Sequence, residues 1–225
     1  MRPRKTLVPP ASVLAVTLLG PPILAVQNVV TSPPRNAVVR PVVGDPLVAL
    51  QPLGPLDPVV LATVADHVRT FLPAEVVILP PRPLPGSAYY APRHRYRGDN
   101  LLDYLDKAPS AGYSRVIGIT DRDISVTNGL IEDWGVIGVA RLSGRSGVVS
   151  TFRLGARSAS DSVLLTRLEK VVLHELGHTF GLSHCASPHC VMRDAQGSIK
   201  PVDSSTGRLC PSCASRLDVI LGRTS

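Results

Sequence analysis

The order of apolar and polar residues predicts strands that alternate with helices. Residues 47–53 (LVALQPL) form a short apolar run typical of a buried strand, and residues 74–80 (AEVVILP) form a second one. Between them, residues 57–72 repeat apolar positions at helical spacing, with Asp57 as the N-cap residue and Pro58 in the first turn. A strand, a helix and a strand in this order favour parallel neighbouring strands with the helix on one face of the sheet.

The alternation continues through the middle of the chain. Residues 81–98 lack a regular pattern and predict a loop, which is followed by a helix over residues 99–108 (DNLLDYLDKA). Residues 114–125 (SRVIGITDRDIS) then predict a strand that runs into an acidic turn. Residues 134–142 and 147–155 are two further β segments joined by the turn sequence SGRSG, which predicts an antiparallel pair near an edge of the sheet.

The longest helical pattern covers residues 160–181, with Ser160 or Asp161 as the N-cap residue. Its apolar face consists of Val163, Leu164, Leu168, Val171 and Val172. Taken together, these elements predict a mixed α/β (α+β) domain, in which a twisted mixed sheet packs against helices.

The N-terminal part of the chain has a different character. Residues 1–30 combine a basic start, MRPRK, with an uncharged apolar stretch, which is the layout of a signal peptide or membrane anchor. Two proline pairs would disturb a spanning helix, so an apolar cytoplasmic extension is the alternative. Residues 31–46 read as a Pro-rich linker, and residues 47–225 as the folded domain. We therefore expect an exported protein whose only membrane contact is through its N-terminal segment.

Composition and charge narrow the function classes. The 225 residues suit a single domain, and the 22 prolines cluster in the first hundred residues, which argues against a helical bundle there. The net charge of +7 comes from scattered arginines, without a long basic run or an aromatic platform motif. Nucleic-acid binding is therefore not expected, and we expect a monomer.

Candidate metal ligands gather at the end of the long helix. His174 and His178 are four residues apart, so their side chains share one helix face and can bind one ion. Glu175 lies on the adjoining face, from which it can act on metal-bound water as a general base. Gly181 can end the helix in a left-handed conformation and so turn His184 back toward the same ion. Three neutral ligands with an open position predict a catalytic zinc site for amide hydrolysis.

The four cysteines form two closely spaced pairs. Cys185 and Cys190 follow His184 directly, and Cys210 and Cys213 lie near the C-terminus. This spacing predicts a closed four-thiolate zinc site. Two disulfides are the alternative if the chain is exported, and His189 is a competing ligand for a mixed cysteine and histidine site.

These residues together resemble the archaemetzincins, a branch of the metzincin metallopeptidases with the motif H-E-x-x-H-x-x-G-x-x-H-C-x4-C-x-M-x17-C-x-x-C. Every specified position is met, with Met192 at the methionine. The resemblance implies a metzincin-like twisted mixed sheet, a central active-site helix and a small zinc-stapled C-terminal subdomain. It implies two zinc ions per chain, one catalytic and one structural, and a Met-turn at Met192 beneath the catalytic zinc ligands. It also implies an edge strand, expected within residues 148–154, that pairs with an extended substrate.

The expected function is that of a zinc-dependent metallopeptidase acting on a peptide or protein. The sequence leaves internal cleavage and aminopeptidase trimming open, and another zinc amide hydrolase is a second enzyme hypothesis. A zinc-stabilised peptide-binding module with little or no hydrolytic activity is the alternative from another class. The presence of Glu175 favours an enzyme, because an inactive scaffold has no need of a base.

Overall fold

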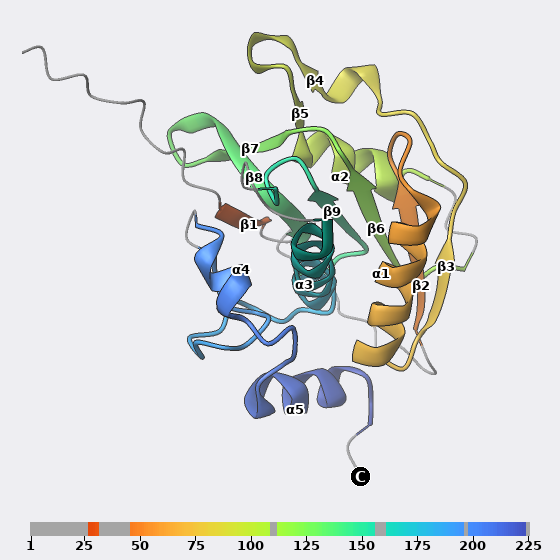
Figure 1. Ribbon diagram of the computed structural model, residues 1–225, viewed down its shortest axis with the longest axis vertical. Coiled ribbons are helices and arrows are strands. Elements are labelled where there is room, and N and C mark those ends of the chain that lie inside the picture. Colours follow the sequence, from red (N-terminus) through yellow and green to blue (C-terminus); the bar gives the residue numbers. More distant parts are fainter. Residues whose placement is uncertain (1–26, 32–45, 109–111, 156–160, 196–197, 224–225) are drawn as a thin grey trace, which may run out of the picture.

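A nine-stranded mixed sheet forms the middle layer of the fold (Figure 1). The structure, a computed structural model, describes residues 27–31, 46–108, 112–155, 161–195 and 198–223. The strand order is β3-β2-β6-β9-β8-β7-β5-β4, and β1 pairs with β8 outside this path. Helices α1 and α3 cover one face of the sheet and α2 covers the other. The expected mixed α/β fold is confirmed.

The elements follow one another in an alternating order. The strands are β1 (Gln27–Thr31), β2 (Leu47–Pro52), β3 (Glu75–Ile78), β4 (Tyr89–Tyr90), β5 (Arg95–Arg97), β6 (Arg115–Thr120), β7 (Ile124–Asn128), β8 (Ile131–Arg141) and β9 (Ser146–Ser150). The α-helices are α1 (Pro58–Phe71), α2 (Gly98–Asp106), α3 (Asp161–Thr179), α4 (Lys200–Ser204) and α5 (Pro211–Ile220). Two short 3-10 helices are η1 (Gly86–Ala88) and η2 (Ala91–Arg93).

The first strand, helix and strand form as the sequence predicts. Asp57 caps α1 because its side chain accepts a hydrogen bond of 2.8 Å from the Val59 N–H, and Pro58 occupies the first turn. β2 pairs in parallel with β3 and, on its other side, with β6. The helix between the two paired strands therefore lies on one face of the sheet, as expected.

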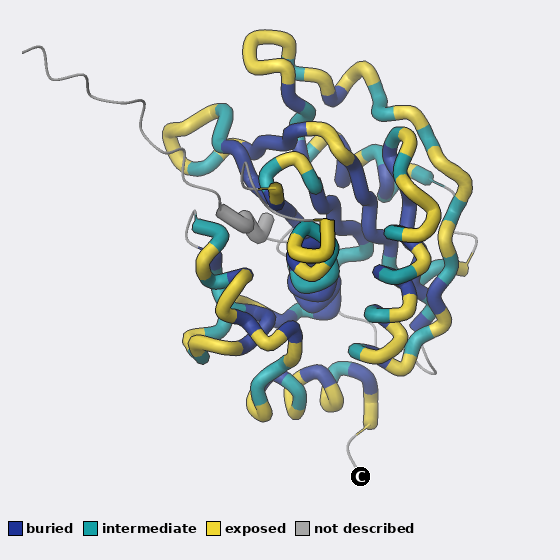
Figure 2. The backbone as a smooth tube through the Cα atoms, viewed as in Figure 1, coloured by how far each residue is buried: buried dark blue, intermediate teal, exposed yellow. Residues whose placement is uncertain are grey.

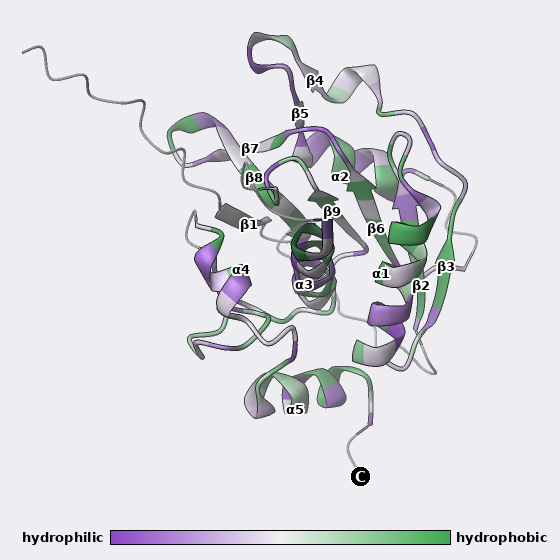
Figure 3. Cartoon of the chain, viewed as in Figure 1, coloured by the Kyte–Doolittle hydropathy of each residue, from purple (hydrophilic) through white to green (hydrophobic). Residues whose placement is uncertain are grey.

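Two apolar clusters hold the layers together. The larger one joins α1 and α3 to one face of the sheet, and the smaller one joins the leucines of α2 to the other face. Figures 2 and 3 show the buried, apolar strands between helices whose outer sides are exposed and polar. α3 is the most deeply buried helix, since every residue from Val171 to Thr179 is buried. Side chains on these turns are therefore shielded from water.

The middle of the sheet corrects several sequence predictions. The segment predicted as a loop over residues 81–98 contains β4 and β5. The strand predicted over residues 114–125 is divided into β6 and β7, and β7 forms an antiparallel hairpin with β8. Local pattern missed this division because the Asp-rich turn between the two strands is short and is flanked by apolar residues on both sides.

The predicted antiparallel pairing of β8 with β9 is confirmed, but its place near a sheet edge is wrong. β9 lies between β6 and β8 and pairs with both of them. The substrate-pairing edge expected within residues 148–154 is therefore also wrong, because the backbone of β9 has no free edge. Sequence pattern cannot reveal this, since the order of strands is set by contacts between distant segments.

The N-terminal residues contain one described strand. β1 lies where the sequence predicts leader and linker, and it pairs in parallel with β8. The remaining leader and linker residues, 1–26 and 32–45, lie outside the described residues, so the signal-peptide prediction is not tested. Within the described part of the chain, no helix combines the length and the apolar character that a membrane span requires.

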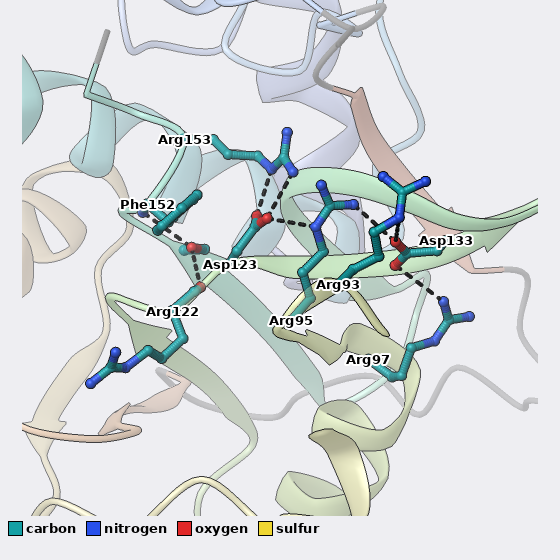
Figure 4. A network of polar contacts seen from close by, with 9 residues as sticks. Arg93, Arg95, Arg97, Arg122, Asp123, Asp133, Phe152 and Arg153 are labelled. Atoms are coloured by element: carbon teal, nitrogen blue, oxygen red, sulfur yellow. Dashed lines mark hydrogen bonds and ion pairs between the residues drawn. The ribbon is translucent and has the colours of Figure 1, made fainter. Parts of the chain in front are cut away.

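A buried ion-pair network fastens the outer strands to the segment after β9 (Figure 4). The Asp123 carboxylate accepts two hydrogen bonds from Arg153, of 2.6 and 2.8 Å, and forms an ion pair of 2.7 Å with Arg95. Arg95 also reaches Asp133 on β8 at 3.1 Å. The Arg153 side chain crosses Gly135, where a Cβ atom would overlap its guanidinium. This network positions the start of β8.

Candidate functional site

Gly181 ends α3 and turns the chain back over the helix. Its φ angle of 95° lies in the left-handed region that favours glycine. The Gly181 N–H donates to the His178 carbonyl at 2.9 Å, and the Leu182 N–H donates to the Gly177 carbonyl at 3.0 Å. These two bonds satisfy carbonyls at the end of the helix, and the predicted helix end at this glycine is confirmed.

The three histidines predicted as ligands lie together. One nitrogen from each of His174, His178 and His184 falls within 4.8 Å of the other two. The Nε2 atoms of His174 and His178 are 2.9 Å apart, and both rings are buried. Backbone carbonyls orient these rings from behind: Nδ1 of His174 donates to Val191 at 2.7 Å, and Nδ1 of His178 donates to Leu182 at 2.7 Å.

The tautomers of the two buried rings fit a bound cation. A carbonyl oxygen only accepts hydrogen bonds, so each Nδ1 atom carries the proton and each Nε2 atom presents a lone pair. Burial lowers the pKa of His174 to about 4 and that of His178 to about 2, which keeps both rings neutral. Two facing lone pairs repel each other without a cation between them. Zinc with imidazole nitrogen ligands matches this donor set.

Asp194 supports the third histidine and was missed by the sequence analysis. Its Oδ2 atom lies 3.6 Å from Nδ1 of His184, whose side chain is partly exposed. Burial lowers the pKa of His184, and the Asp194 charge acts in the opposite direction. A carboxylate behind a ligand histidine orients the ring and raises its basicity. No local pattern marks Asp194 in the sequence, because its contact with His184 depends on how the chain folds after Met192.

Glu175 lies fully buried beside the histidines. Both carboxylate oxygens lack a hydrogen-bond partner among the described residues, and burial raises the pKa of this carboxyl well above its usual range. The carboxyl packs against β8 at Gly138, where a Cβ atom would lie 2.8 Å from the Glu175 Cδ. A buried carboxyl without a hydrogen-bond partner lowers the stability of a fold, so Glu175 is a candidate for a chemical role.

Met192 lies buried beneath the histidine face of α3. A Cβ atom at Gly177 would overlap the Met192 sulfur, so the glycine between the two histidines allows this close approach. The neighbouring residue, Val191, provides the carbonyl that orients His174. Both features agree with the buried position predicted for this methionine.

The four cysteines form a second cluster. Their sulfur atoms lie within 4.8 Å of one another, all four are free thiols, and the Cys185 and Cys210 sulfurs are 3.7 Å apart. A tetrahedron with Zn–S bonds of about 2.3 Å has edges of about 3.8 Å. A hydrogen bond from the Cys213 backbone lowers the pKa of Cys210 to about 7, whereas burial raises that of Cys213.

The competing ligand His189 is not part of this cluster. Its Nδ1 atom instead contacts the Ser204 carbonyl at 3.0 Å, and its side chain is exposed. Burial raises the pKa of the Cys190 thiol, and the Cys210 N–H, which donates to the Cys190 sulfur at 3.4 Å, acts in the opposite direction. The donor set of the cluster therefore consists of four sulfur atoms, as the sequence predicts for a closed zinc site.

Known proteins resemble this chain in sequence and in fold. The model of Peptidase family M54 matches residues 63–219. A relative named archaemetzincin from Natronomonas pharaonis is 33% identical over 174 residues, which cover 74% of this chain and 96% of the relative. One from Methanopyrus kandleri is 38% identical over 159 residues, which cover 70% of this chain and 86% of the relative.

Two solved structures extend the likeness to three dimensions. The crystal structure of archaemetzincin from Methanopyrus kandleri has a TM-score of 0.69 and 34% identity, and the match covers 80% of this chain and 97% of that chain. The archaemetzincin from Archaeoglobus fulgidus, solved in complex with malonate, has a TM-score of 0.65 and 30% identity, with coverage of 76% and 99%.

The fold and the two clusters define a zinc metallopeptidase. Within that class, the chain belongs to peptidase family M54, the family of the archaemetzincins. The resemblance seen in the sequence is therefore confirmed.

Proposed function

We propose that this chain hydrolyses peptide bonds with a zinc ion held by His174, His178 and His184 and with Glu175 as the general base. The observation that carries the proposal is the buried, unpartnered Glu175 carboxyl beside three histidines whose nitrogens converge. When bound, zinc would act as a Lewis acid that polarises a carbonyl and acidifies water. The Val191 and Leu182 carbonyls fix the tautomer and the orientation of two of the rings, so that the Nε2 atom of each would face the ion.

Glu175 would handle the proton of the reaction. As a carboxylate it accepts a proton from the attacking water, and the protonated carboxyl then donates this proton to the departing amine. Burial raises the pKa of this carboxyl, so Glu175 would hold the proton that it takes from water until the departing amine accepts it. The products are a new carboxyl group and a new amine.

The cysteine cluster would hold the second zinc ion. Four sulfur ligands leave no open position, so this ion would be structural. Cys185 directly follows His184, and Cys190 is the residue before Val191. The second ion would therefore brace both segments that support the catalytic histidines.

The alternative function is a peptide-binding module with little or no hydrolytic activity. Such a module gains nothing from a buried carboxyl without a partner, which lowers stability, and a neutral or apolar residue would serve it better. Glu175 therefore favours hydrolysis over binding alone.

A Glu175→Gln variant tests the mechanism, with Glu169→Gln on the same helix as the matched control. The variant should retain the parent's zinc content and lose about 10²–10⁴-fold in kcat/KM on a peptide library. The control should cleave as the parent does. Equal cleavage by a zinc-loaded Glu175→Gln chain would rule out this base.

A further inference from the structure

The outer edge of β8 passes the buried Glu175. β9 pairs with one edge of β8 over Gly138–Ala140. β7 pairs with the other edge, and this pairing ends where Ile124 faces Val136. β7 therefore does not cover the outer edge of β8 after Val136. This uncovered part of the edge includes Gly138, whose backbone contacts the Glu175 carboxyl.

The chain's own strand β1 occupies this part of the edge. Gln27 faces Val136 and Thr31 faces Arg141, in a parallel pairing with one register shift between Gln27 and Val29. Figure 1 shows β1 alongside β8. Residues 32–45 connect β1 to the rest of the domain, so the pairing is intramolecular.

We propose that β1 occupies the edge to which an extended peptide substrate is added, and that the full chain is thereby inhibited by its own N-terminal segment. This inference rests on the proposed peptidase function. An added strand binds mainly through backbone hydrogen bonds. A substrate strand at this edge needs the same N–H and C=O groups of β8 that β1 uses, so the two cannot bind together.

The tether makes a short strand an effective competitor. Because residues 32–45 join β1 covalently to the rest of the domain, its effective concentration at the edge of β8 is about 1 mM. A peptide substrate must therefore displace β1, which raises the apparent KM and leaves kcat nearly unchanged. A purely structural β1 would instead affect stability without affecting KM.

The test replaces both valines of β1 in the full, zinc-loaded chain, as Val29→Pro/Val30→Pro. Proline has no N–H group, and neighbouring N–H groups of a strand point to opposite edges, so one of the two faces β8. The matched control is Val38→Pro/Val39→Pro, a second valine pair that lies outside β1 and outside the described residues.

We expect the β1 variant to cleave peptides with a KM about tenfold lower than the parent and the control, at similar kcat. Hydrogen exchange should show faster exchange of β8 amides in residues 136–141 in this variant alone. A synthetic peptide of residues 26–32 added to the variant should restore inhibition competitively. Together these results would establish β1 as an internal competitor.

An unchanged KM together with faster exchange at β8 would overturn the proposal, because β1 would then have left the edge of β8 without any effect on substrate binding. A loss of thermal stability without a fall in KM would assign β1 a structural role and overturn it as well. If none of the chains cleaves peptides, the proposed function fails separately. Binding of a fluorescent extended peptide then tests whether β1 competes for the edge of β8. Tighter binding to the β1 variant than to the parent supports competition, and equal binding contradicts it.

Discussion

The backbone of Gly138 on β8 lies directly against the carboxyl group of Glu175 on α3. A Cβ atom at this glycine would stand 2.8 Å from both Cγ and Cδ of the glutamate, which is closer than such atoms approach in folded proteins. The contact joins the sheet to the candidate base, so the position of this carboxyl depends on an element far away in the sequence.

A Gly138→Ala substitution should displace Glu175 and lower activity. Because a displacement of about 1 Å can cost about 10²-fold in rate, we expect kcat to fall by about that factor while zinc content is unchanged. Kinetics on a peptide library together with metal analysis provides the measurement. Gly86→Ala is the control, since a Cβ atom there meets no atom within 4 Å. A Gly138→Ala chain with parental kcat would show that the contact does not position the base.

Metal removal should affect activity and folding separately. We expect about two zinc ions per chain, and a mild chelator should first remove the ion at the three histidines, because that site has an open position. Activity should then disappear while the thermal transition shifts little. Removal of the second ion should lower Tm strongly, since binding energy at a structural site contributes to folding. A protein with one zinc ion per chain would contradict this prediction.

A Cys213→Ser substitution should weaken the zinc site at the histidines as well as its own. Cys190 precedes Val191, whose carbonyl orients His174, and the Val191 N–H donates to the Arg208 carbonyl at 2.8 Å. Loss of the cysteine site loosens this segment, so we expect a 10–100-fold loss of zinc affinity at the histidines. Competition with a chelator of known affinity measures this loss. An unchanged zinc affinity at the histidines would show that the two sites are independent of each other.

An Asp123→Asn substitution should destabilise the fold. Asp123 is buried and pairs with the buried Arg95 and with Arg153, whose side chain is 11% exposed, so the change weakens two ion pairs that are shielded from water. We expect the free energy of unfolding to fall by about 3 kcal/mol. Asp121→Asn is the control, because its pair with Arg122 is exposed and should contribute less than about 1 kcal/mol. Denaturant unfolding measures the free energy of unfolding of both variants. Equal losses would contradict the prediction that burial makes the ion pairs of Asp123 contribute more than the exposed pair of Asp121.

Local spacing identified most of the candidate site. The four-residue interval between His174 and His178 and the glycine three residues later follow from helix geometry, which depends only on neighbours in sequence. The same holds for the Asp57 cap of α1. Asp194 lay outside the recognised motif, and its role depends on how the chain folds after the turn at Met192.

The sequence by itself determined the class of the protein, the helices α1, α2 and α3 and the residues that can hold metal, because these depend on short-range periodicity and on side-chain chemistry. Only the tertiary structure decided that β9 is an interior strand, that Gly138 touches Glu175, and that β1 lies on the edge of β8. Each of these facts concerns pairing between distant segments. Such pairing is settled by competition among all strands for the same backbone hydrogen bonds, which no local pattern records.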